Sequence, residues 1–326
     1  MNRSPDSRDI ASAAIQVAAA IIRDESGRIL LSQRPTGKHL AGTWEFPGGK
    51  CEPGESWNRG LERELHEELG IRSSQIMPYL TLTHTYPEHT VRLALFEVGR
   101  VEGRLHGREG QALRWADLTE LPLLDMPAAD RPIVKALSIS PHYAISPEPD
   151  HIGGVGALLD WAEHSMAGGM RLLQLRAHSL PEPELAELGL RFGELARNHG
   201  ALWLLNGPPG LALELGADGV HLTAHALQTA KSRPLPEDKL VIASCHHRQD
   251  LAHAGAIGAD LACVSPVEYT SSHPQAKPMG WSGLARLCER TPVPVFALGG
   301  MSPDDLDSAR RHGAFGVAGI SGFGCR

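Results

Sequence analysis

From residue 142 onward, short apolar runs alternate with helical stretches at intervals of about 20 to 25 residues. This alternation is typical of repeated βα units, in which each helix carries the chain back to start another parallel strand. The runs expected to form strands are His142–Ser146, Arg171–Ala177, Ala201–Asn206, Gly219–Thr223, Leu240–Cys245, Leu261–Val267, Val293–Gly299 and Gly316–Ser321. They predict a (β/α)8 barrel. Because the chain ends almost directly after the last run, we expect the closing helix to be missing. A partner chain in a homo-oligomer, or the rest of the chain, would then cover that edge.

The N-terminal part has a different pattern and is expected to form its own domain over residues 1–139, with the barrel over residues 140–326. The segments that indicate this are strand-like runs at Val17–Ile22, Arg28–Gln33 and Thr90–Val98, a strand end passing into a helix at Trp115–Leu118, an extended stretch at Leu121–Pro127 and a short helix at Pro132–Leu137. Mixed strands with helices on both sides of a sheet predict an α/β/α sandwich.

The charge and cysteine content of the chain indicate which kinds of binding partner and which cellular compartment to expect. The 326 residues carry a formal net charge of −7 and no basic run, whereas surfaces for DNA or RNA are normally strongly positive. We therefore expect a small-molecule partner and no nucleic-acid polymer. The five cysteines, Cys51, Cys245, Cys263, Cys288 and Cys325, include no Cys-x-x-Cys pair, which favours reduced thiols in a cytoplasm. The polar start Met1–Asp9 and the short run Ile15–Ile22 support neither a signal peptide nor a membrane span.

Three glutamates stand at helical spacing in the N-terminal part. Glu64, Glu67 and Glu68 are at i, i+3 and i+4, which in a helix places three carboxylates on one face. Carboxylates so placed repel one another, and hard oxygen ligands without His or Cys point to Mg²⁺, or Mn²⁺, as the counter-ion. Gly70 is expected to end the helix. A solvated acidic helix is the competing interpretation.

The stretch from Gly49 to Ile71 resembles the Nudix box, Gly-x5-Glu-x7-Arg-Glu-U-x-Glu-Glu-x-Gly-U with U apolar, at every fixed position. Beyond this box, residues 15–137 are similar to the MutT branch of the Nudix family, the 8-oxo-dGTP pyrophosphohydrolases. The segments that carry this likeness are Ser32–Pro35, Gly42–Lys50, Gly107–Gln111 and Pro127–Pro132.

This resemblance implies Mg²⁺-dependent hydrolysis of 8-oxo-dGTP and related nucleoside triphosphates, which sanitises the nucleotide pool and prevents mutation. In the family, water attacks the inner of the two terminal phosphorus atoms, giving the nucleoside monophosphate and pyrophosphate, while cations offset charge repulsion. The metal ligands implied by the resemblance are the Gly48 carbonyl, Glu64, Glu67, Glu68 and, from a loop, Glu109. Glu64 is the expected general base with Glu109 as its rival, and Arg63 is expected to orient the carboxylates.

The same resemblance implies a substrate-binding set, namely Arg34, His39, Glu45, Phe46, Pro47, Gly48 and Asp130. Arg34 matches a phosphate-contacting arginine and His39 a substrate-contacting position, whereas Phe46 fits a core position equally well. Asp130 stands where bacterial relatives carry an asparagine that reads the oxidised purine edge. A carboxylate accepts from the N7–H of 8-oxoguanine, but it donates to O6 only when protonated.

The C-terminal half resembles the thiamine-phosphate synthase and TenI superfamily, through Gln174–Arg176, Gly216–Leu222, Ala243–His246 and Phe296–Met301. Barrel catalysis resides at the strand ends. The resemblance implies a phosphate cup of backbone N–H groups at Gly299, Gly300, Ile320 and Ser321, with Gln174, Arg176 and Asn206 as further ligand candidates.

The synthase positions that would hold Mg²⁺ and pyrophosphate are changed. Gly207 follows Asn206 in place of an aspartate, and the stretch Thr223–Ala226 has alanine where a second aspartate belongs. Lysines of the synthase appear as His178 and His273. Without these charges the synthase reaction should fail, so the barrel is expected to be a degenerate module that binds a phosphate ligand.

Two alternatives stay open. The Nudix site would act on diphosphates of the thiamine pathway, or the barrel would act as a thiazole tautomerase or a thiamine-phosphate sensor. Pro266 occupies the place of the tautomerase histidine, which leaves the histidines at 246, 247 and 273 as candidate proton shuttles.

Overall fold

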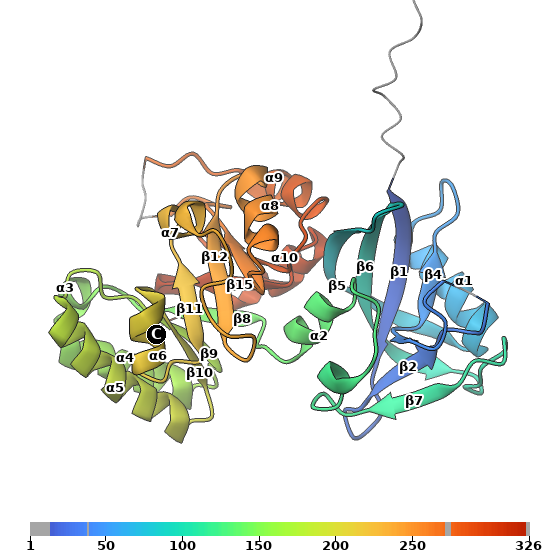
Figure 1. Ribbon diagram of the computed structural model, residues 1–326, viewed down its shortest axis with the longest axis horizontal. Coiled ribbons are helices and arrows are strands. Elements are labelled where there is room, and N and C mark those ends of the chain that lie inside the picture. The colour runs from blue at the N-terminus through green and yellow to red at the C-terminus, as the bar shows by residue number, and fades with distance from the viewer. Residues whose placement is uncertain (1–13, 38, 271–274, 324–326) are drawn as a thin grey trace, which may run out of the picture.

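The computed structural model describes residues 14–37, 39–270 and 275–323. Two bodies lie side by side, with the N-terminal sheets on one side and a barrel on the other (Figure 1). His273 and Cys325, which the sequence analysis named, lie outside the described residues. In the part of the chain that the structure describes, no helix has both the length and the apolar character needed to cross a membrane.

The N-terminal body contains two sheets. In the larger, of order β4-β1-β6-β5, β1 (Ile15–Ile22) runs parallel to β6 (Thr90–Glu102) and antiparallel to β4 (Gly48–Lys50). The mixed sheet is therefore confirmed. The smaller sheet joins β3 (Trp44–Glu45), β2 (Ile29–Gln33) and β7 (Leu113–Ala116). Two helices, α1 (Trp57–Leu69) and α2 (Arg131–Leu137), flank the sheets.

Two expectations for this body were wrong. β5 (Arg72–Thr85) was not expected, because its first half is polar and Pro78 interrupts its pattern; it forms by pairing along β6, with a register shift between Pro78 and Leu80. The strand end expected at Trp115–Leu118 is confirmed, because Trp115 and Ala116 end β7, but a turn follows it in place of the expected helix. The stretch Leu121–Pro127, which was expected to be extended, begins with the short 3-10 helix η1 (Leu121–Leu123), with a proline in its first turn.

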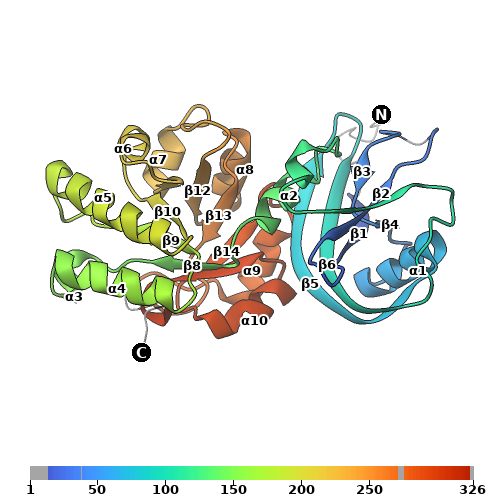
Figure 2. The same ribbon diagram turned by 90° about the horizontal axis from the view of Figure 1, so that it is seen from below.

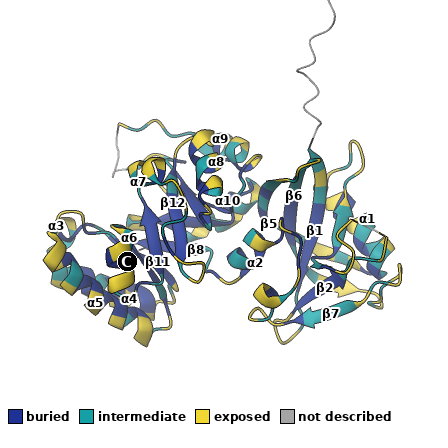
Figure 3. Cartoon of the chain, in the orientation of Figure 1, coloured by how far each residue is buried: buried dark blue, intermediate teal, exposed yellow. Residues whose placement is uncertain are grey.

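The C-terminal body is a closed barrel of parallel strands, which confirms the predicted fold class. The strands are β8 (His142–Ile145), β9 (Leu172–Leu175), β10 (Leu202–Leu205), β11 (Gly219–Leu222), β12 (Leu240–Cys245), β13 (Leu261–Val264), β14 (Val295–Leu298) and β15 (Gly316–Gly319). Nearly every residue of these strands is buried (Figure 3). Such strands read as short continuous apolar runs because both of their faces are covered.

Helices and short turns surround the barrel strands. They are α3 (Pro149–Ile152), α4 (Val155–Ala167), α5 (Glu182–Asn198), α6 (Pro209–Glu214), α7 (Ala224–Thr229), α8 (Arg248–Ala256), α9 (Gly280–Cys288), η2 (Pro303–Asp305), α10 (Leu306–Arg311) and η3 (Ser321–Phe323). The 3-10 turn η3 is the last element described after β15.

The two bodies meet where β5 passes the turns that precede β14 and β15 (Figure 2). The backbone N–H of Thr81 donates to the Gly313 carbonyl at 3.0 Å, and that of Thr83 donates to the Thr291 carbonyl at 2.7 Å. Tyr79 and Phe315 pack edge to face across this boundary, with ring centroids 5.7 Å apart. One hydrophobic cluster runs through both bodies, so the sheet and the barrel share a core.

Candidate functional site

Helix α1 presents the predicted carboxylates because its opposite face is anchored. Leu61, Leu65 and Leu69 are buried at i, i+4 and i+8, and they pack with apolar residues of β1 and β6. The side chain of Ser56 accepts from the Arg59 N–H at the start, and Gly70 ends the helix at φ 71°. Glu64 and Glu68 are half-buried and border this leucine stripe, and Glu67 lies furthest from it and is exposed.

Arg63 ties the carboxylates together. Its Nη1 donates to Glu64 Oε1 at 2.8 Å and to Glu67 Oε2 at 3.1 Å, and its Nη2 donates to Glu55 Oε2 at 3.0 Å and to the Lys50 carbonyl at 2.9 Å. These bonds, first to Glu55 and then to Glu64, raise the pKa of Arg63 above its ordinary value. The same guanidinium lowers the pKa of Glu55. Arg63 thus fixes carboxylates that would otherwise repel one another.

Glu64 is held under the strand that precedes the helix. A Cβ added at Gly49 would lie 2.4 Å from Glu64 Cδ, so only glycine leaves room for this carboxylate. At Gly48, where φ is 145°, an added Cβ would lie 2.1 Å from the Ala18 carbonyl oxygen. The two glycines therefore bring β4 against both β1 and the carboxylate face.

The loop that carries Glu109 is fastened to the end of α1. The Glu68 carbonyl accepts from the Arg108 N–H at 2.8 Å and from Gln111 Nε2 at 3.1 Å. Gln111 also accepts from the Glu109 N–H at 2.9 Å. The loop that carries Glu109 therefore lies beside the C-terminal end of α1.

The donor set fits a hard divalent cation by its chemistry, because every predicted ligand is an oxygen atom. Among the residues that the structure describes, no three His, Cys, Asp or Glu side chains converge closely enough to hold a metal ion. The Arg63 cation instead lies between Glu64 and Glu67. Glu67 is the more exposed of the two, at 57% against 16% for its side chain, so it has room to change position.

Arg34, His39 and Glu45 of the predicted substrate-binding set lie together around the turn between β2 and β3. Arg34 Nη1 lies 2.5 Å from Glu45 Oε2, and Arg34 Nε donates to the His39 carbonyl at 2.8 Å. Asp130 is 7% exposed, and burial, followed by the nearby charge of Glu45, raises its pKa to about 8. Its carboxyl group is therefore mostly protonated at neutral pH, and it can both donate and accept a hydrogen bond.

Phe46 is 3% exposed and belongs to the shared hydrophobic cluster, and Pro47 beside it is also buried. Of the two interpretations given for Phe46, the structure places it in the core. A residue that sequence reasoning missed is Tyr86, whose hydroxyl bonds to the backbone of Ala129 beside Asp130. The rings of His84 and His89 lie 4.5 Å and 5.2 Å from the Tyr86 ring. The sequence could have pointed to Tyr86 in one way, because it is an aromatic residue directly before the turn into β6.

The barrel has a cavity of about 470 Å³ at the carboxyl ends of its strands, and the predicted barrel residues all line it. These are Gln174, Arg176, Asn206, Gly299, Gly300, Ile320 and Ser321. His178 and His246 also line the cavity, whereas His247 caps α8 through Asp250. His221 and Ser244, which the sequence analysis included only within segments of resemblance and not among the ligand candidates, line the cavity as well.

Comparisons with known proteins match the two bodies separately. A family model described as thiamine monophosphate synthase matches residues 142–323, and one described as NUDIX domain matches residues 18–136. A putative thiamine-phosphate synthase 2 of Aquifex aeolicus is 34% identical over 165 residues, which are 51% of this chain and 89% of that protein. An 8-oxo-dGTP diphosphatase of Escherichia coli is 37% identical over 123 residues, which are 38% of this chain and 95% of that protein.

Among solved structures, the chain is similar to a thiamine phosphate pyrophosphorylase from Pyrococcus furiosus, with a TM-score of 0.46 and 25% identity. The similarity covers 55% of this chain and 85% of that one.

Proposed function

We propose that this chain, which belongs to the Nudix family through its N-terminal body and to the thiamine monophosphate synthase family through its barrel, hydrolyses 8-oxo-dGTP to the monophosphate and pyrophosphate. Removal of this nucleotide keeps an oxidised base out of DNA. The observation that carries the substrate assignment is Asp130, a buried acid placed beside Glu45 and Arg34 and protonated at neutral pH.

The base-reading role follows from hydrogen-bond chemistry. A protonated carboxyl group offers one O–H donor and one carbonyl acceptor, as the amide of asparagine offers N–H and C=O. In 8-oxoguanine, N7–H donates and O6 accepts, so Asp130 matches both atoms. In guanine, N7 accepts, and the carbonyl oxygen of Asp130 would face an acceptor. A missing partner for a buried polar atom costs about 1–3 kcal/mol, or about 5- to 150-fold in affinity.

The hydrolytic role is assigned to the face of α1. Glu64, Glu67, Glu68 and Glu109, with the Gly48 carbonyl, would hold Mg²⁺, which when bound neutralises phosphate charge and makes water more acidic. Glu64 would take the proton of the attacking water, and its bond to Arg63 and its close approach to Gly49 support this assignment. Arg63 is a positioning residue, because its nitrogens are occupied by Glu55, Glu64, Glu67 and the Lys50 carbonyl.

Arg34 is assigned to the phosphates, which would compete with Glu45 for its guanidinium. His39 lies at the same end, with its ring 6.4 Å from those of Tyr86 and His89. These residues would hold the nucleotide across β4, with the base at Asp130 and the phosphates at α1.

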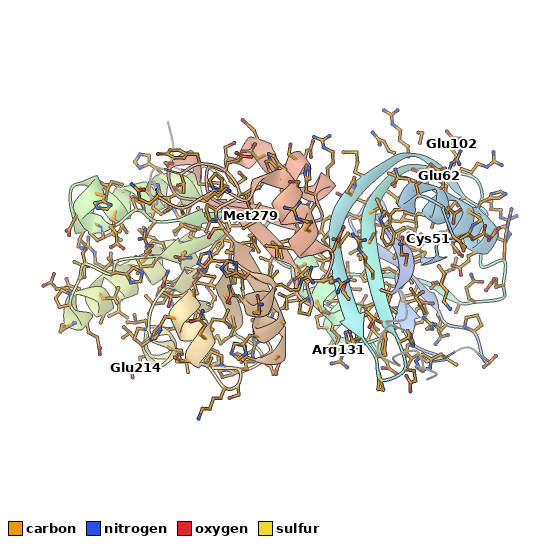
Figure 4. The ribbon with its side chains drawn as sticks, turned by 90° about the horizontal axis from the view of Figure 1, so that it is seen from above. Cys51, Glu62, Glu102, Arg131, Glu214 and Met279 are labelled. Atoms are coloured by element: carbon orange, nitrogen blue, oxygen red, sulfur yellow. The ribbon has the colours of Figure 1, made fainter. Side chains whose placement is uncertain are left out.

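A turnover panel in Mg²⁺ tests this function. The substrates are 8-oxo-dGTP, dGTP, thiamine diphosphate and hydroxymethylpyrimidine diphosphate. We expect 8-oxo-dGTP to give the highest kcat/KM and Glu64→Gln to lower it by at least about 100-fold. Glu62→Gln is the matched control, because Glu62 is an exposed carboxylate on the same helix (Figure 4). Preference for either thiamine-type diphosphate would replace the proposed substrate.

A further inference from the structure

The loop between β6 and β7 folds over the C-terminal end of α1. The His106 N–H donates to the Leu69 carbonyl at 3.2 Å, and the Arg108 N–H donates to the Glu68 carbonyl at 2.8 Å. The guanidinium of Arg108 adds a bond from Nη1 to the His66 carbonyl at 2.9 Å. The last carbonyls of a helix lack a full set of partners within the helix, so the loop supplies donors that they need. The cation of Arg108 also suits the negative end of the helix dipole.

One side chain of this loop, Gln111, joins the backbones of two predicted metal ligands. Its Oε1 accepts from the Glu109 N–H at 2.9 Å, and its Nε2 donates to the Glu68 carbonyl at 3.1 Å. A backbone N–H needs an acceptor and a carbonyl needs a donor, so these two partners admit only one orientation of the amide. The side chain of Gln111 therefore sets the separation between the backbone of Glu109 and that of Glu68.

The turn that carries Glu109 is packed against this amide and against the helix end. A Cβ added at Gly107 would overlap the Gln111 carbonyl oxygen and lie 2.9 Å from Gln111 Oε1. The Gly110 N–H closes the turn by donating to the Gly107 carbonyl at 3.2 Å. On the other side, a Cβ added at Gly70 would lie 2.8 Å from Arg108 Nε. The glycines thus let the loop sit close to α1.

The bond between Gln111 and the Glu109 N–H is not explained by capping of the helix. The His106 and Arg108 N–H groups already donate to helix carbonyls, and Glu109 lies outside the helix. Gln111 is half-buried, and both ends of its amide are used on backbone atoms. These contacts leave Gln111 holding the loop rather than contacting a substrate.

We propose that Gln111 is a positioning residue of the metal site, which fixes the backbone of Glu109 relative to Glu68 before a divalent cation binds. This inference rests on the proposed function, because it takes Glu68 and Glu109 as ligands of the bound metal. A preformed loop needs less ordering when the cation binds, which favours affinity. Residues that orient metal ligands typically contribute about 10- to 100-fold to metal affinity.

Metal binding is tested by titration calorimetry of Mn²⁺ into the full chain without nucleotide. Gln111→Met keeps the length of the side chain and removes both hydrogen bonds. We expect it to weaken Mn²⁺ binding by about 10- to 100-fold. Gln228→Met, the same chemical change at an exposed position on α7 of the barrel, is the matched control and should bind Mn²⁺ as the wild type does.

The preformed state of the loop is tested by amide hydrogen exchange in EDTA. We expect the Glu109 amide to be protected in the metal-free wild type and to exchange faster in Gln111→Met. The Tm of this variant should stay close to that of the wild type, because the Glu68 carbonyl keeps its bond from the Arg108 N–H. If Gln111→Met does not fold, protection of the Glu109 amide in the wild type decides alone.

Three results would overturn the proposal. They are an unprotected Glu109 amide in the metal-free wild type, no Mn²⁺ binding by the wild type, and wild-type Mn²⁺ affinity in Gln111→Met. Neither readout requires hydrolysis, so the two proposals can fail separately. Weaker Mn²⁺ binding by Gln111→Met without turnover of 8-oxo-dGTP by the wild type would refute the proposed substrate alone. Turnover together with unchanged Mn²⁺ binding in the variant would refute the role of Gln111 alone.

Discussion

Gly49 and Glu64 lie so close that a single methyl group at residue 49 would overlap the Glu64 carboxylate. The obstruction is the far end of a flexible side chain, so the carboxylate rather than the backbone would yield. We predict that Gly49→Ala lowers kcat by about 100-fold, the loss expected from misplacing a catalytic group by about 1 Å, with little change in Tm. Gly156→Ala, where no atom lies within 4 Å, is the control and should leave kcat unchanged. A full loss of structure in Gly49→Ala would contradict this account.

Arg63 is predicted to act through the glutamates that it binds. Loss of its charge-assisted bonds should lower kcat by about 10- to 150-fold, from about 1.5–3 kcal/mol, while KM stays nearly constant. Steady-state kinetics of Arg63→Gln measure kcat and KM separately and so test this prediction. Arg59→Gln, on the same helix, serves as the comparison and should have the wild-type kcat. A large rise in KM at unchanged kcat would show that Arg63 contacts the substrate.

Asp130 makes base selection depend on pH. Its pKa of about 8 means that the donor is lost as the pH rises through 8, so the ratio of kcat/KM for 8-oxo-dGTP over dGTP should fall there. Asp130→Asn keeps both hydrogen bonds and should make this ratio independent of pH between 6 and 9. A wild-type ratio that is flat over the same range would show that Asp130 does not read the base as a neutral acid.

The same residue has a consequence for stability. The folded pKa of Asp130 lies above its unfolded value of about 4, so the folded state binds more protons between pH 4 and 8. The free energy of unfolding therefore falls through this window as the pH rises, by an amount on the order of a few kcal/mol. Chemical denaturation at a series of pH values should show a smaller decline in Asp130→Asn than in the wild type. Parallel curves would rule out the raised pKa.

Removal of divalent metal should abolish the activity assigned to the N-terminal body. We predict that EDTA abolishes nucleotide hydrolysis and that Mg²⁺ restores it, because the carboxylates of α1 are oxygen ligands of the kind that Mg²⁺ prefers. Hydrolysis that continues in EDTA would contradict the assigned role of Glu64, Glu67 and Glu68.

Local periodicity made most of the fold predictable. The barrel strands are short runs buried on both faces, and α1 carries Leu61, Leu65 and Leu69 at helical spacing, so each element has its signal within a few neighbouring residues. β5 gave no such signal, because it gains its order from pairing with β6 and from docking against Gly313 and Thr291. Contacts between distant segments cannot be read from local pattern.

The same limit applies to the sites. The spacing of Glu64, Glu67 and Glu68 indicated a metal-binding face, but the protonation of Asp130 depends on burial that only the folded chain provides. The sequence shows Gln111 only as part of a segment of resemblance, and its bonds to Glu68 and Glu109 form only when the loop folds over α1. The role of Tyr86 likewise depends on the approach of Ala129.

The most direct measurement is the identity of the products formed from 8-oxo-dGTP in Mg²⁺, followed by phosphorus NMR with the wild type and Glu64→Gln. The account predicts 8-oxo-dGMP and pyrophosphate in equal amounts from the wild type, and almost no product from the variant. Release of orthophosphate with a nucleoside diphosphate, or undiminished pyrophosphate release by Glu64→Gln, would contradict it.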